Sequence, residues 1–408
     1  MTDAVIVSTA RTPIGKAYRG ALNATGGATL LGHAIGEAVK RAKVDPAEVE
    51  DVVMGAALQQ GSTGGNIARK ALLRAGLPVS VGGTTIDRQC ASGLQAIALA
   101  ARSVIFDGVE IAVGGGGESI SLVQNDKMNA FQATDPALLE IKGDVYMPMI
   151  DTAEIVSKRY GISREKQDEY ALESQRRTAA AQQGGKFNDE LAPITTKMAV
   201  TDKATGNVSF KDITLSQDEG PRPETTAEGL AGLKAVRGDG FSITAGNASQ
   251  LSDGASACVI MSDATAAKRG LQPLGIFRGF VAHGCEPDEM GIGPVFAVPR
   301  LLKRHGLTVD DIGLWELNEA FAVQVLSFLD HFGIDDDDPR VNEYGGAIAI
   351  GHPLASSGVR LMNQLARQFE EHPEVRYGLT AMCIGLGQGG TVIWENPHYN
   401  KKAKAAKR

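Results

Sequence analysis

An internal repeat relates the first third of this chain to its last third, and it limits the fold more than any other feature of the sequence. In 45–53 and again in 308–315, a helix-capping residue is followed three positions later by an acid and then by an apolar pair. In 91–97 and again in 356–362, small residues ending in Ser-Gly precede an apolar run. Both pairs have the same separation to within two residues, which indicates duplication. The alternative, that βα units merely resemble one another, stays open on this pattern alone.

Strand and helix patterns alternate within each copy. Val5–Val7 is typical of a buried strand, the apolar residues between 31 and 39 recur at the spacing of one helix face, and a second apolar strand follows around 52–54. This alternation predicts an α/β fold. With 408 residues the chain exceeds what one hydrophobic core supports, so we expect two or three domains or a duplicated one.

The composition changes in the middle of the chain. A long polar helix is predicted over 163–183, and a turn-rich stretch over 202–222. We therefore expect a first half made of 1–121 with 251–272, an inserted loop domain over 122–250, and a second half over 273–408. Insertions of this length often cover an active site, although a surface embellishment is the alternative.

Charge, cysteine content and hydropathy exclude several classes of protein. Lys and Arg number 41 against 48 Asp and Glu, and the net charge of −7 argues against a general grip on nucleic acid or on an anionic membrane. The four cysteines are far apart and form no CxxC pair, so neither a disulfide framework nor a zinc site is indicated. The start of the chain lacks an export signal, and no apolar run is long enough to span a membrane. We expect a cytoplasmic protein, and we interpret the acidic run 335–338 as a solvated turn.

Cys90 stands where a strand around 84–86 gives way to an amphipathic helix. A thiol at a helix N-terminus faces unpaired N–H groups and the positive end of the helix dipole, which favour the thiolate. This position predicts a nucleophile ionised at neutral pH. Because cysteine is also among the most buried residue types, an inert core residue remains the alternative.

His352 occupies the equivalent place in the second copy, after the apolar stretch 345–350, which we expect to be a strand. An imidazole there can take a proton from a thiol and later donate a hydrogen bond to an oxyanion. A lone histidine is more often structural, so the surrounding motifs have to decide.

Two further motifs lie at strand ends in the second copy. Cys383 belongs to a glycine-rich turn, expected after a strand, whose N–H groups can bind an acyl oxygen. Asn318 is expected at the end of another strand, with Glu319 in the first turn of the next helix, where negative charge is stabilising. The alternatives are glycines used for packing and an asparagine used as a helix N-cap.

Together these motifs describe acyl transfer through a cysteine thioester. In them the chain resembles the thiolase family, the acetyl-CoA acetyltransferases and 3-ketoacyl-CoA thiolases, over nearly its whole length. The matching stretches are RQCASG around Cys90, NEAF at 318–321, GGAIAIGHP at 345–353 and CIGLG at 383–387. The resemblance implies a duplicated thiolase fold with five layers, αβαβα, and a loop domain over the site. It also implies a homodimer or homotetramer without a metal or redox cofactor, in which CoA is a substrate.

The resemblance also implies a mechanism. His352 activates Cys90, whose sulfur attacks the 3-keto carbon of a 3-ketoacyl-CoA, and Cys383 protonates the departing acetyl-CoA enolate. A second CoA then removes the acyl group, or the reverse Claisen condensation runs. His352 and a water held by Asn318 form one oxyanion hole, and the N–H groups at Cys90 and Gly385 form the other.

The CoA site implied by the resemblance uses the insertion and the loop from Ala245 to Ser249. Arg222 is expected near the adenine and Ser249 near the pantetheine, and Met149 and Phe321 are further expected contacts of the substrate. For Arg222 a solvated surface position is an equally good interpretation.

The sequence departs from the family pattern at Ala355, Tyr344, Leu386 and Gly117. Tyr344 and Leu386 stand near catalytic motifs, where they are expected to reshape the acyl pocket. The stretch 147–154 lacks the histidine typical of short-chain biosynthetic enzymes, which favours a degradative enzyme accepting longer or bulkier acyl chains. The alternatives are a decarboxylating ketoacyl synthase and a non-catalytic acyl-CoA or lipid carrier of the same fold.

Overall fold

The strands of both copies join in one mixed sheet. The computed structural model describes residues 2–400, and in them the main sheet has ten strands. Their bounds are β1 Ala4–Arg11, β2 Gly15–Lys16, β3 Asp51–Gly55, β4 Gly82–Ile86, β5 Ile111–Ser119, β8 Ser252–Ser262, β9 Gly275–Gly284, β10 Ile312–Leu317, β11 Tyr377–Ile384 and β12 Gln388–Glu395. They lie in the order β10-β11-β12-β9-β1-β8-β5-β3-β4, with β2 paired to β8.

This strand order confirms the predicted duplication. The order β1-β8-β5-β3-β4 in the first copy matches β9-β12-β11-β10 in the second, and a parallel bridge from Trp315 to Val341 takes the place of β4. The parallel pairs β3–β5 and β10–β11 correspond, as do the antiparallel pairs β5–β8 and β11–β12. Even the two predicted caps correspond, because Asp45 and Thr308 each close a capping box before a 3₁₀ turn, η1 Pro46–Glu48 and η5 Val309–Asp311.

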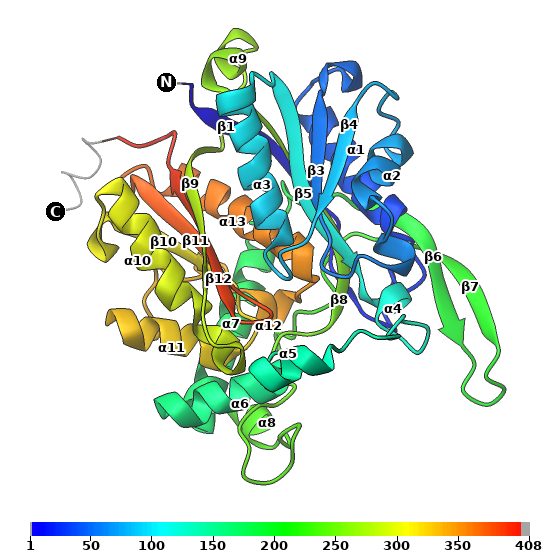
Figure 1. The fold of residues 1–408 in the computed structure, drawn as a ribbon, viewed down its shortest axis with the longest axis vertical. Coiled ribbons are helices and arrows are strands. Elements are labelled where there is room, and N and C mark those ends of the chain that lie inside the picture. Colours follow the sequence, from blue (N-terminus) through cyan, green and yellow to red (C-terminus); the bar gives the residue numbers. More distant parts are fainter. Residues whose placement is uncertain (1, 401–408) are drawn as a thin grey trace.

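Helices cover the outer face of each copy of the sheet, and two further helices lie between the two copies. The bounds are α1 Gly27–Arg41 and α2 Ile67–Arg74 on the first copy, α10 Gly293–His305 and α11 Ala322–Phe332 on the second, and α3 Ser92–Arg102 with α13 Ser357–Glu371 between them. Figure 1 shows α1 and α2 at one side, α10 and α11 at the other, and α3 in the middle. The apolar core divides accordingly into two outer clusters and one central cluster. The five-layered αβαβα arrangement is thus confirmed.

The central helix is apolar on nearly every side. Among the described residues, the stretch Gln89–Asp107 has the length and composition of a membrane-crossing helix, and most of it is buried inside the fold. It comprises α3 and the π-helical turn η3 Ser103–Asp107. Most residues of α3 itself are buried between the two halves of the sheet, which accounts for this composition, whereas Phe106 and Asp107 of η3 are exposed.

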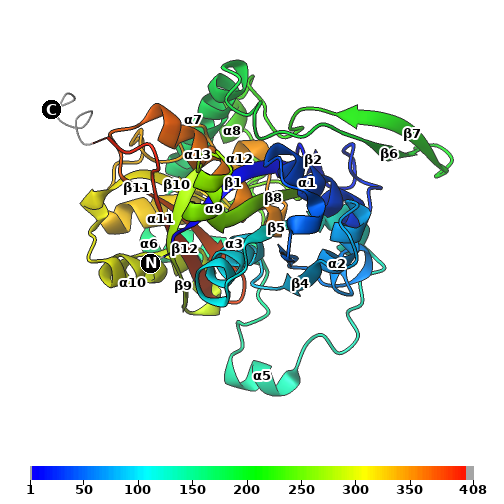
Figure 2. The same cartoon turned by 90° about the horizontal axis from the view of Figure 1, so that it is seen from above.

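The middle of the chain forms mostly helices and one hairpin. Its elements are α4 Ile120–Val123, α5 Pro136–Ile141, α6 Met149–Tyr160, α7 Arg164–Gln183, β6 Ile194–Thr201, β7 Val208–Leu215 and α8 Ala227–Ala231. Outside it lie α9 Asp263–Lys268, α12 Ala347–Ile350 and the 3₁₀ turns η2 Gly61–Thr63, η4 Pro287–Ile292 and η6 Leu354–Ser356. Figure 2 shows the β6–β7 hairpin and the segment around α5 extending away from the body.

The sequence predicted the long helix of this region better than its hairpin. α7 runs over the predicted range, and the Ser163 side chain caps it by accepting a hydrogen bond from the Lys166 N–H. The prediction of turns over 202–222 was wrong for 208–215, which pair with β6. Alternation of apolar and polar residues along Val208–Leu215 is the strand signal that the turn residues around it concealed.

Candidate active site

Cys90 lies in a tight turn between β4 and α3, two residues before the helix begins. Ser92 holds this turn, since its hydroxyl accepts the Arg88 N–H at 2.9 Å and donates to the Gln89 carbonyl at 2.6 Å. Gln89 has a φ of +47°, in the left-handed region that side chains rarely adopt. The Gly385 N–H donates to the Cys90 sulfur, and the residue as a whole is half-buried. The turn therefore presents the sulfur to an N–H donor.

The expectation of a thiolate at Cys90 is wrong. Withdrawal of water from the sulfur raises the pKa of this thiol to about 12, and the charge of Glu118 acts in the same direction. The Gly385 N–H lowers the pKa, but by less than the loss of hydration raises it. A helix dipole contributes only about 0.3–1 kcal/mol at most sites. Cys90 is therefore a neutral thiol at rest and needs a base during attack.

His352 follows a helical turn, not the predicted strand. Residues Ala347–Ile350 form α12 because the Glu319 carboxylate accepts the Ile348 N–H at its start, and Gly351, with a φ of +112°, then turns the chain. The imidazole is buried, and burial lowers the pKa of His352 to about 3. It is therefore neutral and able to accept a proton.

Two neighbours fix the orientation of the imidazole. The Ser357 hydroxyl lies 2.6 Å from His352 Nδ1, and the Asn318 amide nitrogen lies 3.4 Å from Nε2. An amide NH₂ can only donate, so Nε2 is the acceptor and Nδ1 carries the proton that it donates to Ser357. The lone pair of Nε2 is thereby directed into the site.

Asn318 is buried at the end of β10 and is not a helix cap. The residue at the N-cap of α11 is Phe321, so the alternative interpretation of Asn318 is wrong. Glu319 likewise lies outside the first turn of α11, and its carboxylate binds the hydroxyls of Tyr170 and Ser174. Among the described residues the side-chain oxygen of Asn318 has no hydrogen-bond partner, which leaves it available to a water or a substrate.

Cys383 lies within β11, two residues before the turn in which it was predicted. Its thiol donates to Gln324 Oε1 at 3.2 Å, and Gln324 Nε2 donates to the Asn318 carbonyl at 3.1 Å. Burial raises the pKa of Cys383 well above its usual value, and the neighbouring Cys90 sulfur acts in the same direction. Sequence reasoning missed both Gln324 and Ser357, although Gln324 stands just beyond the NEAF motif.

The turn that carries Cys90 and the loop that carries His352 meet because the N-termini of α3 and α13 touch. A Cβ on Gly93 would collide with the Ala355 carbonyl oxygen, and one on Gly358 would lie 2.5 Å from the Leu94 nitrogen. Buried Glu118 ties the His352 loop to the chain that follows β3, since its carboxylate accepts N–H groups of Ala57, Leu58 and Ala355. Glycine at these helix starts thus allows the Cys90 turn and the His352 loop to meet.

An apolar wall stands beside Cys383. Its sulfur is buried in a cluster with Met290 and Ala320, against which the predicted substrate contacts Met149 and Phe321 pack. These two residues come from different regions of the chain, α6 and the N-cap of α11, and the structure brings them to the same cysteine.

A cavity of about 210 Å³ opens next to the His352 loop. Arg222, which is exposed, and Ala245 line it together with Gln250, whose carbonyl accepts the His352 N–H at 3.3 Å. Ser249 does not line this cavity. Its N–H donates to the Ala320 carbonyl at 2.9 Å, which places it between the cavity and the apolar wall.

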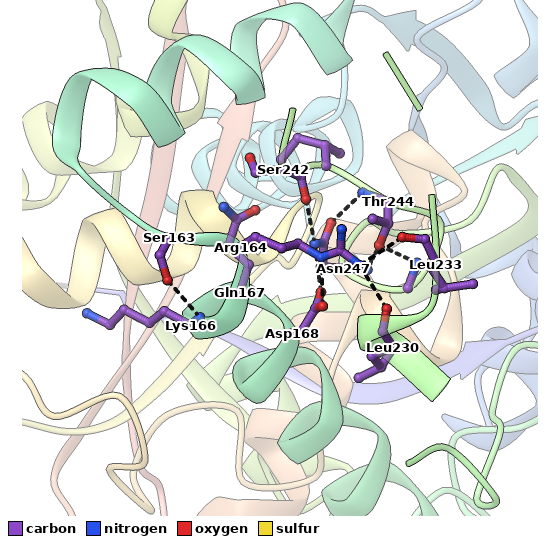
Figure 3. A network of polar contacts seen from close by, with 12 residues as sticks. Ser163, Arg164, Lys166, Gln167, Asp168, Leu230, Leu233, Ser242, Thr244 and Asn247 are labelled. Atoms are coloured by element: carbon purple, nitrogen blue, oxygen red, sulfur yellow. Dashed lines mark hydrogen bonds and ion pairs between the residues drawn. The ribbon is translucent and has the colours of Figure 1, made fainter. Parts of the chain in front are cut away.

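A polar network fixes the loop that carries Ala245 (Figure 3). Buried Asn247 donates to Asp168 Oδ1 at 2.9 Å and accepts the Thr244 N–H at 2.8 Å. Arg164 pairs with Asp168 at 2.7 Å and donates to carbonyls of Leu230 and Leu233. The start of α7 therefore holds both the 242–247 loop and α8 in place.

The departures from the family pattern do not all lie at the site. Tyr344 packs with Ile14 and Phe187 and donates its hydroxyl to Glu371, so the expectation that it shapes the acyl pocket is wrong. A side chain at Gly117 would point at Leu31 of α1, and the Ala355 carbonyl faces Gly93. Only Leu386, exposed and with a φ of +66°, adjoins the Gly385 donor.

The acidic run 335–338 is engaged in ion pairs, Asp336 with Lys166 and Asp338 with Arg340. Within residues 2–400, no three His, Cys, Asp or Glu side chains are grouped so as to hold a metal ion. All four cysteines are free.

Comparison with known proteins gives a family match over both copies. The models "Thiolase, N-terminal domain" and "Thiolase, C-terminal domain" match residues 4–264 and 271–396. The 3-ketoacyl-CoA thiolase of Bacillus subtilis (strain 168) is 42% identical over 396 residues, covering 97% of this chain and 100% of that protein. The peroxisomal 3-ketoacyl-CoA thiolase B of Mus musculus is 41% identical over 398 residues, covering 97% and 91%.

Solved structures agree with these matches. The crystal structure of human mitochondrial 3-ketoacyl-CoA thiolase has a TM-score of 0.84 and 37% identity, covering 97% of this chain and 99% of that chain. The same enzyme in complex with CoA has a TM-score of 0.83 and 36% identity, covering 97% and 98%. The matched regions contain both copies of the repeat and every residue of the site, and this chain belongs to the thiolase family.

Proposed function

We propose that this chain is an acyl-CoA C-acyltransferase that cleaves 3-ketoacyl-CoA with CoA to acetyl-CoA and a shortened acyl-CoA. The relatives named 3-ketoacyl-CoA thiolases support the reaction class. The mechanism is supported by the contact between two helix starts, which brings the turn of the neutral thiol Cys90 up to the loop of the neutral, oriented imidazole of His352. Catalysis then uses side chains, backbone N–H groups and two CoA molecules.

In the first half-reaction, Cys90 Sγ attacks the 3-keto carbon while His352 Nε2 takes the thiol proton. Because thiol and imidazole are both neutral at rest, the proton moves as the sulfur attacks and not before. The bond between the second and third carbons breaks, and its electron pair forms the acetyl-CoA enolate. Cys383 supplies the proton that converts this enolate to acetyl-CoA, and the acyl group stays on Cys90 as a thioester.

In the second half-reaction, His352 first gives its proton to the Cys383 thiolate. It then takes the proton of a CoA thiol as that thiol attacks the thioester, and it delivers this proton to the departing Cys90 sulfur. The N–H groups of Cys90 and Gly385 stabilise the tetrahedral oxyanion, and each such donor is typically worth about 3 kcal/mol of barrier. The other oxyanion, that of the enolate, is stabilised by the protonated His352 Nε2 and a water on Asn318. Support for this water is the unpartnered side-chain oxygen of Asn318.

The test is thiolysis of acetoacetyl-CoA and of longer 3-ketoacyl-CoAs by the wild-type chain and by Cys90→Ser. We expect thiolysis by the wild type and its loss in Cys90→Ser, with CoA binding retained. Retained turnover in Cys90→Ser refutes the nucleophile. A wild type that instead requires a malonyl thioester indicates a decarboxylating synthase, and a wild type that binds acyl-CoA without turnover indicates a carrier.

We propose that the cavity at Arg222 and Ala245 takes the outer part of CoA, with Ser249 toward the pantetheine. Support comes from the CoA-bound human mitochondrial relative and from Gln250, which joins the cavity to His352. Arg222→Ala is expected to raise KM for CoA several-fold at unchanged kcat. An unchanged KM refutes the assignment of Arg222.

A degradative role is our preferred physiological direction, and the apolar wall at Met149 and Phe321 supports acyl chains longer than acetyl. Comparison of kcat/KM across chain lengths tests this role. A preference for acetoacetyl-CoA over every longer substrate contradicts it.

We further propose a homodimer or homotetramer in the cytoplasm. β4 stands at one end of the sheet, pairs only with β3 over residues 2–400, and there presents a free edge of the kind that joins strands between subunits. Four free cysteines favour a reducing compartment. The measured mass in solution tests the first proposal, and cell fractionation tests the second, since relatives also occur in peroxisomes.

A further inference from the structure

One buried amide joins two of the groups in the proposed mechanism. Gln324 lies in α11 and is 3% exposed. Its Oε1 accepts the Cys383 thiol proton at 3.2 Å, and its Nε2 donates to the Asn318 carbonyl at 3.1 Å. No other side chain in the described structure hydrogen-bonds to the sulfur of Cys383. Its position is fixed by packing, because its Cβ and Cγ lie next to Gly291 of η4.

The surroundings determine which end of this amide faces the sulfur. The Asn318 carbonyl can only accept, so it must face the Gln324 NH₂. The amide oxygen is then left to face Cys383. A flipped amide would set two carbonyl oxygens against each other in a site without bulk water, at a cost of about 1–3 kcal/mol for the unsatisfied acceptor alone.

An amide oxygen can form a hydrogen bond only with the protonated form of the cysteine. The thiol donates a hydrogen bond to it, whereas a thiolate would meet its partial negative charge. Hydrogen bonding to the neutral form of an acid disfavours ionisation. The effect adds to burial, which already raises the pKa of Cys383.

We infer that Gln324 is a positioning residue that keeps Cys383 protonated and aims its S–H for the proton transfer at the second carbon of acetyl-CoA. This inference rests on the proposed function. In thiolysis the S–H proton passes to the enolate carbon, and Cys383 is left as a thiolate. In the reverse direction this thiolate, facing an oxygen, is a strong base that takes a proton from the methyl group of acetyl-CoA.

The proposed mechanism contains two kinds of step, and Gln324 is expected to affect only one of them. Acyl transfer between Cys90 and CoA uses His352 and the N–H groups around the sulfur, and it needs no proton from Cys383. Proton transfer at carbon does need Cys383. A change at Gln324 should therefore slow the second kind of step and spare the first, whereas general damage to the site would slow both.

The experiment compares Gln324→Met with the wild type in three assays: thiolysis of acetoacetyl-CoA, exchange of the acetyl-CoA methyl protons with D₂O, and exchange of labelled CoA into acetyl-CoA. We expect Gln324→Met to lower the first two by about 10² or more, the scale of general acid–base catalysis, and to leave the third within about threefold. The alkaline limb of the thiolysis pH profile should move to lower pH, because the thiol has lost its acceptor.

Gln368→Met is the matched control. Gln368 is equally buried and binds Glu316 Oε1 at 2.7 Å, away from the cysteines. It should leave the ratio of proton exchange to CoA exchange unchanged. Equal losses in all three assays for Gln324→Met, or no loss in any, overturn the inference.

Gln324→Glu provides the conservative variant. Protonated in this buried site, it keeps an acceptor for Cys383 and a donor for Asn318, so it should restore proton exchange above the Gln324→Met level at acid pH. Equal impairment of Gln324→Met and Gln324→Glu overturns the inference. Where Gln324→Met is too unstable to assay, loss of proton exchange in Gln324→Glu at acid pH overturns it. Failure of the proposed function itself is distinguishable, because the wild type would then show no thiolysis.

Discussion

Removal of the Ser357 hydroxyl should slow every step that uses His352. The hydroxyl lies 2.6 Å from Nδ1, and both residues are buried. Ser357→Ala leaves the buried Nδ1–H without its partner, at a cost of about 1–3 kcal/mol. If that cost falls on the transition state, in which the imidazole becomes charged, kcat/KM falls about 5- to 150-fold.

The assays are thiolysis of acetoacetyl-CoA and exchange of CoA into acetyl-CoA. Because His352 acts in both half-reactions, both rates should fall together, unlike those of Gln324→Met. Ser356→Ala is the control: this neighbouring hydroxyl bonds Ser256 at 3.1 Å instead of the imidazole. If Ser357→Ala and Ser356→Ala have the same rates, or if Ser357→Ala affects only one of the two assays, the reasoning about the tautomer is wrong.

Two further predictions concern stability. Gly93→Ala sets a methyl group against the Ala355 carbonyl and should lower the free energy of unfolding by about 1–3 kcal/mol. Gly36→Ala is the control and should not lower it, because its Cβ would lie 3.8 Å from that of Ala75. Urea denaturation measures both variants. Burial raises the pKa of Glu316 from 4.5 to about 8. Since the folded state then holds a proton that the unfolded state releases, stability should fall between these pH values by at most about 1.4 kcal/mol per unit. Glu316→Gln should remove that part of the slope, and an unchanged slope would contradict the buried acid.

The sequence predicts the fold well because the information is periodic and occurs twice. The capping boxes at Asp45 and Thr308, the helix starts at Gly93 and Gly358, and the range of α7 all follow from local patterns that the structure repeats. These local patterns fail where a contact with a residue distant in the sequence determines the secondary structure. The residues 347–350 are an apolar run that looks like a strand, but a carboxylate from the NEAF motif caps them as a helical turn.

The site shows the same limit. Sequence motifs identify Cys90, His352, Cys383 and Asn318, since each stands in a dense pattern of small residues. The partners of these groups are dispersed, as Gln324 lies in the middle of an ordinary apolar helix. The ionisation of Cys90 also depends on a competition between a helix dipole and lost hydration, and only the folded environment shows that lost hydration dominates.

The duplication explains why the base and the nucleophile are shaped by related residues. Ser92 and Ser357 occupy equivalent places, each just before the glycine at which one central helix touches the other copy. In the first copy the hydroxyl bonds the chain at Arg88 and Gln89 and bends it so that the thiol is presented. In the second copy it bonds an imidazole and sets its tautomer. A serine hydroxyl at the start of a buried helix is therefore present in both copies and has a different chemical role in each. The contacts of these helix starts, Gly93 with Ala355 and Gly358 with Leu94, bring the Cys90 turn and the His352 loop together.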